Sequence, residues 1–200
     1  MTVPIQSSPY PRKSQFFLFF LTLLIIAAFK FYAPRDLPSL GAVPAFRATF
    51  VTAEGRGVLA REDLLGKPWI ADFVFTRCQG PCPMLTANMA QLARSLPEAI
   101  RLVSFTVDPE NDTLGVLQTY AKRFNANSSR WCFLRGAKGE LYQLMKSGFK
   151  LSVAQDVQTI THSTKFVLVD ARGDIRGYYD GESAIDLKNI QKDALRLLSN

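Results

Sequence analysis

The chain has 200 residues, of which 48% are hydrophobic and 20% charged; this composition excludes a disordered protein and fits one globular domain with an accessory segment. The formal net charge of +7 comes from scattered Lys and Arg residues, not from a basic run interleaved with aromatic side chains, which argues against nucleic-acid binding. Three cysteines are too few for a fold held together by disulfides.

The N-terminal part of the chain is predicted to anchor it in a membrane. Residues 1–15 form a polar tail, and residues 16–33 are almost entirely apolar and long enough for one transmembrane helix. A cleaved signal peptide is the alternative, although Phe31 is bulky where a cleavage site needs a small residue. Residues 34–44, which are rich in proline, are expected to form a short, stiff linker.

The location of the domain follows from this anchor. Basic residues flank the apolar segment on both sides, so the positive-inside rule discriminates little between the two orientations. We expect the N-terminus in the cytoplasm and the globular domain outside the inner membrane, in the periplasm.

From residue 45 onward, strand and helix patterns alternate. Residues 46–60 predict a hairpin, residues 61–68 a short helical turn, and residues 69–75 a buried strand that is apolar apart from Asp72. The other expected elements are a helix (82–96), a strand (100–107), a helix (113–124), a strand (131–136), a helix (138–149), a polar loop (150–160), a hairpin (161–181) and a helix (183–199). This order predicts an α/β fold in which helices flank both faces of a mixed sheet.

Cys78 and Cys82 lie in the segment FVFTRCQGPCPM, where the buried strand ends and the next helix begins. A disulfide between them would close a very small loop and add little stability, which favours chemistry over a structural role. Helix N-terminal amides stabilise a thiolate, so we expect a depressed pKa for Cys82 above all, and for Cys78. The pair is then a redox pair or part of a site for a soft metal ion. Cys132, beside Trp131 in a buried strand, is expected to be a packing residue.

His162 is the only histidine in the sequence, so a metal site that needs imidazole depends on it. It precedes the strand TKFVLVD, at an edge of the sheet from which it can approach the cysteines. Two thiolates and one imidazole suit copper, whereas a closed zinc site needs a fourth ligand. A surface histidine with no ligand role is the alternative.

Two aspartates follow the second buried strand in the loop DPEND. We expect Asp112 to cap the helix that Thr113 opens. Asp108, at the carboxyl end of the strand, is either a turn residue or a partner of the metal-binding side chains. Met84 and Met89 follow the helical spacing of apolar residues and are expected in the core, not at a copper ion.

Four segments together resemble the Sco/SenC family: DFVFTRCQGPCPMLT, VSFTVDPENDT, WCFLRG and THSTKFVLVDARGDIRGYYDG. Members of that family are thioredoxin-like, membrane-anchored copper proteins that assist the assembly of cytochrome c oxidase. The resemblance runs in order over residues 45–198, and it implies a thioredoxin-like domain over residues 45–200. It also implies that Cys78, Cys82 and His162 bind copper.

The resemblance implies a metallochaperone, and not an enzyme, that delivers copper to the copper-accepting subunit of cytochrome c oxidase. Periplasmic copper donors or thiol reductants are its other expected partners. The alternative is a thiol-disulfide oxidoreductase in which Cys78 and Cys82 form the catalytic redox pair. The three-residue spacer between the cysteines and the presence of His162 favour copper. Gln79 and Thr161 depart from the proline and the aspartate that are common in the family, which bears on copper affinity and oxidation state.

Overall fold

A computed structural model describes residues 17–24, 36–126, 130–151, 155–156, 159–160 and 163–199. The chain divides into two compact units, residues 1–36 and residues 37–200. In the first unit, residues 17–24 are helical and exposed. Within the described parts of the chain, no helix combines the length and the apolar character needed to cross a membrane. The rest of the transmembrane helix predicted over residues 16–33 lies outside the described residues.

The second unit is built on a seven-stranded sheet with the strand order β2-β1-β5-β4-β3-β8-β9. Strands β5, β4 and β3 run parallel at its centre, because helices α2 and α3 supply the crossovers between them. Antiparallel pairs flank this centre on both sides. The strand bounds are β1 Arg47–Val51, β2 Arg56–Ala60, β3 Trp69–Val74, β4 Arg101–Thr106, β5 Trp131–Arg135, β8 Lys165–Val169 and β9 Ile175–Asp180.

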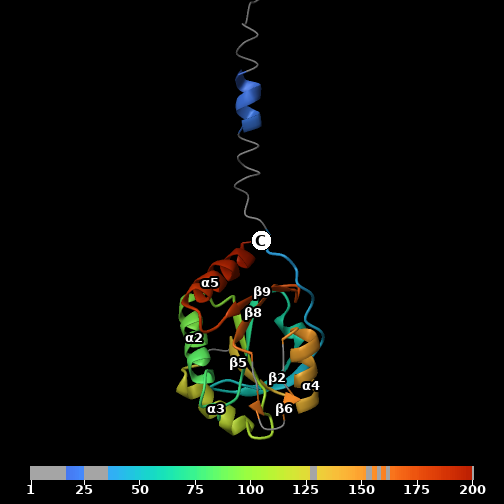
Figure 1. Ribbon diagram of the computed structural model, residues 1–200, viewed down its shortest axis with the longest axis vertical. Helices are drawn as coiled ribbons and strands as arrows, with labels where there is room; N and C mark the ends of the chain where they lie inside the picture. The colour runs from blue at the N-terminus through green and yellow to red at the C-terminus, as the bar shows by residue number, and fades with distance from the viewer. Residues whose placement is uncertain are drawn as a thin grey trace, which may run out of the picture. The chain divides into compact units, whose positions relative to one another are not determined.

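Helices cover both faces of the sheet, which confirms the predicted mixed α/β architecture (Figure 1). Helices α2, α3 and α5 pack on one face, where Ile70 and Val74 of β3 join their core cluster. Helix α4 and the π-helical turn η2 cover the other face, against Trp69 and Phe73. The helix bounds are η1 Arg61–Leu64, α2 Cys82–Ser95, α3 Leu114–Arg123, α4 Lys138–Gln143, η2 Leu144–Gly148 and α5 Ala184–Leu198. Every residue of β3 is buried because helices cover both faces of the sheet, which explains the almost continuous apolar sequence of this strand.

Two segments predicted as irregular are partly ordered by hydrogen bonds. Within residues 150–160, the short strands β6 (Gln155–Asp156) and β7 (Thr159–Ile160) pair antiparallel where the sequence predicted only a polar loop. In the predicted linker, the Leu40 N–H donates to the Ile175 carbonyl at 2.8 Å. The linker segment that follows residue 36 is therefore attached to the hairpin formed by β8 and β9.

The carboxyl ends of β3 and β4 place two loops side by side. The Val107 N–H donates to the Val74 carbonyl at 2.9 Å, so residues 75–81 and residues 107–113 leave the sheet next to each other. Because side chains alternate along a strand, Asp72 shares the face of its neighbours Ile70 and Val74, which is the face covered by α2 and α3. This corner of the fold holds every predicted site residue that the structure describes.

Candidate metal and thiol site

The two cysteines of the candidate site are joined through the backbone of Phe75. The Cys78 N–H donates to the Phe75 carbonyl at 3.3 Å and closes a turn. The Phe75 N–H donates to the Cys82 sulfur, and the Cys78 and Cys82 side chains are hydrogen-bonded to each other. Cys78 is half-buried, Cys82 is buried at the start of α2, and both are in the reduced, thiol form. The turn therefore brings both sulfurs within reach of a single soft metal ion or of each other.

Burial, and not the helix terminus, controls the acidity of Cys82. Removal of this thiol from water raises its pKa far above the ordinary value, and the hydrogen bond from Phe75 lowers it only in part. The Cys78 side chain adds a smaller increase to the Cys82 pKa. The prediction of a depressed pKa at Cys82 is therefore wrong for the metal-free pair, because desolvation outweighs the helix N-terminus.

Asp72 is a buried carboxyl group in the core beneath the cysteines. Its side chain is 1% exposed, and neither carboxylate oxygen makes a hydrogen bond of ordinary geometry to a described residue. Burial raises the pKa of Asp72 to about 7, and the neighbouring Ser104 hydroxyl offsets this increase only in part. The charge of Asp72 also acts on Cys82 and on Tyr120 of α3. The one polar residue of the predicted strand is therefore close enough to Cys82 for its charge to raise the pKa of that thiol.

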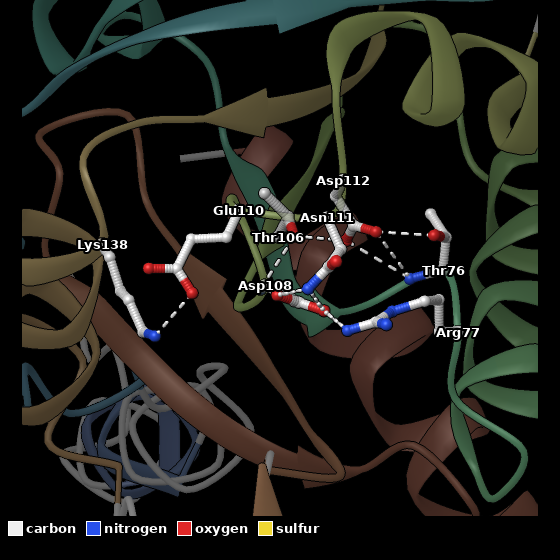
Figure 2. Close-up of polar contacts among 8 residues, drawn as sticks. All are labelled: Thr76, Arg77, Thr106, Asp108, Glu110, Asn111, Asp112 and Lys138. Atoms are coloured by element: carbon white, nitrogen blue, oxygen red, sulfur yellow. Dashed lines mark hydrogen bonds and ion pairs between the residues drawn. The ribbon is translucent and has the colours of Figure 1, made fainter. Parts of the chain in front are cut away.

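Asp112 is bonded to the segment that precedes the first cysteine, as Figure 2 shows. Its carboxylate accepts the Thr76 backbone N–H at 3.2 and 3.3 Å, the Thr76 hydroxyl at 2.5 Å and the Thr106 hydroxyl at 2.5 Å. The predicted capping role of Asp112 is wrong, because the Thr113 side chain accepts the Val116 N–H and caps α3. Asp112 instead connects the loop after β4 to the loop after β3.

Asp108 makes a second connection between the same two loops. Its carboxylate accepts the Arg77 guanidinium at 2.9 Å and the Asn111 amide at 2.9 and 3.0 Å (Figure 2). Burial acts to raise the pKa of Asp108, but the hydrogen bonds from Asn111 and Arg77 outweigh it and hold this pKa below its usual value. Asp108 thus holds Arg77, the residue next to Cys78.

The predicted third ligand, His162, lies outside the described residues. Among the residues that the structure does describe, no group of three or more His, Cys, Asp or Glu side chains is arranged to hold a metal ion. Of the three predicted copper ligands, the structure describes the two cysteine thiols. Two adjacent thiols are the ligand type that Cu(I) prefers, so their chemistry fits copper.

The remaining sulfur-containing residues differ in their burial. Cys132 is 5% exposed and Met89 is fully buried, as packing residues should be. The prediction that Met84 lies in the core is wrong, since this side chain is 46% exposed on the first turn of α2. Apolar spacing alone assigned Met84 to the buried face.

Sequence reasoning missed the contact between Thr76 and Asp112, which lie 36 positions apart. One signal could have found it. Both residues follow the carboxyl ends of successive buried strands, and polar side chains at such ends of a parallel sheet commonly meet. The contact itself depends on the parallel register of β3 and β4, which the sequence does not specify.

Comparisons with known proteins find one family. A family model described as SCO1/SenC matches residues 42–198. A SCO1 protein homolog of Bacillus subtilis (strain 168) is 34% identical over 151 residues, which cover 72% of this chain and 78% of that protein.

Solved structures give the same result. BsSco, described as a member of the Sco family of cytochrome c oxidase assembly proteins with a disulfide switch, has a TM-score of 0.60 at 30% identity, and the match covers 79% of this chain and 96% of that one. ScoI of Bradyrhizobium japonicum, solved with copper bound, has a TM-score of 0.61 at 19% identity, with 76% of this chain and 98% of that one covered. At that identity the ScoI match shows a shared fold.

Proposed function

Because the chain belongs to the SCO1/SenC family, we propose that it binds copper through Cys78 and Cys82 and delivers it to the copper site of cytochrome c oxidase during assembly. The observation that carries the proposal is the turn in which the Phe75 backbone bonds to both cysteines and their thiols bond to each other. The copper in the ScoI structure and the assembly role in the description of BsSco support the choice of cargo and destination.

His162 is the proposed third ligand. It supplies the only imidazole of the chain, and the family resemblance assigns it to copper together with the two cysteines. Two thiolates suit Cu(I), and an added imidazole extends the site to Cu(II). His162 therefore determines which oxidation states of copper the site can hold.

The unequal burial of the two thiols gives the transfer a direction. Cys78 is half-buried, whereas Cys82 is enclosed beneath the turn. A thiolate of the acceptor therefore reaches the copper from the side of Cys78 and replaces that ligand first. Cys82 is the last ligand to release the metal.

A thiol-disulfide oxidoreductase is the second candidate function, and the contact between the two thiols favours it. The thiolate of Cys78 would attack a disulfide of a partner and expel one partner thiolate, which takes up a proton. Cys82 would then attack the Cys78 sulfur of the mixed disulfide, lose its own proton and release the second partner thiolate. The partner gains two electrons, and the chain ends with a disulfide between Cys78 and Cys82.

The N-terminal unit has a proposed role as a membrane anchor. Residues 16–33 are almost entirely apolar, and residues 17–24 within them are helical. An anchor in the inner membrane would hold the copper-binding domain on the periplasmic side, close to an oxidase that is assembled in the same membrane.

The proposed function is tested by copper retention in the full chain, purified in detergent. The reduced protein is loaded with Cu(I) without oxygen, freed of excess metal by gel filtration and assayed for copper. We expect about one copper per chain for wild type, and loss of copper for Cys78→Ala and Cys82→Ala. Cys132→Ala is the matched control, because Cys132 is a buried free thiol outside the turn, and this variant should retain the metal.

The role of His162 has its own readout. His162→Ala should retain Cu(I) but lose the thiolate charge-transfer absorption that wild type shows with Cu(II). Copper retention by Cys78→Ala would contradict the proposed site. A wild-type chain that holds no copper but rapidly reduces a test disulfide would favour the oxidoreductase.

A further inference from the structure

The Asp112 side chain is enclosed and is bonded to two different segments. It is completely buried, and the hydroxyl of Thr76 and the hydroxyl of Thr106 donate to different oxygens of its carboxylate. The Thr76 backbone N–H adds a third donor. A buried carboxylate with several donors is held in one orientation, since the loss of any of them leaves a buried charge less well solvated.

Local structure does not need these bonds. The turn after β4 is closed by the backbone, where the Asp112 N–H donates to the Asp108 carbonyl at 2.8 Å. The helix that follows is capped by Thr113. The Asp112 carboxylate bonds back to Thr106, at the start of its own loop, and across to Thr76, in the segment that leads to Cys78.

The contact continues from Thr76 to both sulfurs. The N–H of Thr76 and the C=O of Phe75 belong to the same peptide unit. On one side this unit donates to Asp112, and on the other it accepts the Cys78 N–H at 3.3 Å. The next peptide unit toward the strand donates the Phe75 N–H to the Cys82 sulfur. Two adjacent peptide units thus connect the Asp112 carboxylate to both cysteines.

We infer that Asp112 is a positioning residue, which acts through Thr76 to hold the Cys78 and Cys82 sulfurs close together. The inference rests on the proposed function only in that it concerns the same cysteine pair. A turn that is already fixed loses less conformational entropy when the sulfurs close on a metal or on each other. Removal of the contact lowers the effective concentration of one thiol at the other.

The test measures that effective concentration without copper. The full chain in detergent is equilibrated with mixtures of reduced and oxidised glutathione, and the fraction of the Cys78–Cys82 disulfide is determined. In this equilibrium the disulfide of glutathione breaks, the protein disulfide forms, and the two protein protons pass to the two glutathione thiolates. The equilibrium constant is the effective concentration.

Thr76→Val and Thr76→Ser form the central pair of variants. Valine keeps the shape of threonine but removes the hydroxyl that donates to Asp112, whereas serine keeps it. We expect the effective concentration to fall roughly tenfold in Thr76→Val, which corresponds to the loss of one charge-assisted hydrogen bond, and to stay within about twofold of wild type in Thr76→Ser. Asp112→Asn, which keeps the shape but removes the charge, should also lower it.

Thr113→Ala is the control for a merely structural effect. It removes the cap of α3 at the position next to Asp112, and the hydrogen bond that is lost comes from Val116 of the helix and not from the cysteine turn. It should lower thermal stability and leave the effective concentration unchanged. Equal effective concentrations in Thr76→Val, Thr76→Ser and wild type would overturn the inference, even if Asp112→Asn failed to fold. Copper retention is measured separately, so failure of the proposed function does not decide this result.

Discussion

Asp72 and Asp112 are both buried carboxyl groups beside the cysteine pair, but their surroundings are opposite. Asp112 lies in a loop and is bonded to three donors from two segments. Asp72 lies in the central strand β3 and makes no hydrogen bond of ordinary geometry to a described residue. Burial alone therefore does not define the role of a carboxylate. The donors around Asp112 fix the orientation of its carboxylate, whereas the core around Asp72 opposes ionisation and raises its pKa to about 7.

The largest expected effect comes from Asp72 and depends on pH. The increase of its pKa from 3.8 to about 7 means that the folded chain binds this proton more tightly than the unfolded chain. The free energy of unfolding therefore falls as the pH rises from about 4 to about 7, by roughly 4 kcal/mol at most, with 1.36 kcal/mol per pKa unit.

Asp72→Asn isolates this contribution. The variant removes the titrating group and keeps its shape, so the other ionisable groups are common to both proteins. Denaturant unfolding of the reduced, metal-free chain at pH 5 and pH 8 should show a steeper loss of stability in wild type than in the variant. Parallel pH profiles for the two proteins would mean that Asp72 has an ordinary pKa, and the contrast with Asp112 would disappear.

The second effect is the loss of stability in Asp112→Ala. The substitution leaves the buried Thr106 hydroxyl and the half-buried Thr76 N–H and hydroxyl without their acceptor. We expect the free energy of unfolding at pH 7 to fall by about 3 kcal/mol, measured by urea denaturation. A loss below about 1 kcal/mol would show that these hydrogen bonds are not formed in solution.

A smaller loss of stability is expected for Thr113→Ala, which removes the N-terminal cap of α3. Its side chain accepts one backbone N–H, from Val116. Loss of a threonine cap lowers the free energy of unfolding by about 1 kcal/mol. The same urea experiment measures it, and a loss equal to that of Asp112→Ala would indicate that the two residues act through the helix terminus alone.

The smallest effect is expected at an exposed ion pair beside the network of hydrogen bonds made by Asp108 and Asp112. Lys138 and Glu110 form an ion pair at 2.9 Å in which both side chains are largely exposed (Figure 2). Exposed ion pairs contribute little because water and salt screen them. Lys138→Ala should therefore leave urea unfolding and the disulfide equilibrium unchanged within error. A clear loss in either measurement would show that the network extends beyond the buried carboxylates.

Much of the scaffold around the site is predictable from the sequence. The apolar run that ends at Val74 and the helical pattern that begins at Cys82 give the strand, the turn and the helix in the right places. These assignments succeed because periodicity and the turn-forming Gly80 and Pro81 act locally. The position of the cysteine pair follows from them.

The errors concern properties that depend on distant parts of the chain. The acidity of Cys82 depends on how completely other elements enclose it, which the helix terminus alone does not reveal. Asp112 was assigned to its nearest helix because its true partner, Thr76, meets it only when β3 and β4 pair in register. Met84 fits the apolar spacing of α2 but is 46% exposed, whereas Cys82 and Leu85 at the same end of the helix are buried.

The most direct test of the account is the copper K-edge X-ray absorption spectrum of the full chain loaded with Cu(I). We expect two sulfur neighbours at the copper in wild type and in Cys132→Ala, and one sulfur neighbour in Cys78→Ala measured with less than one copper per chain. A spectrum that shows only nitrogen or oxygen neighbours in wild type, or that is unchanged in Cys78→Ala, would contradict the claim that Cys78 and Cys82 together hold the metal.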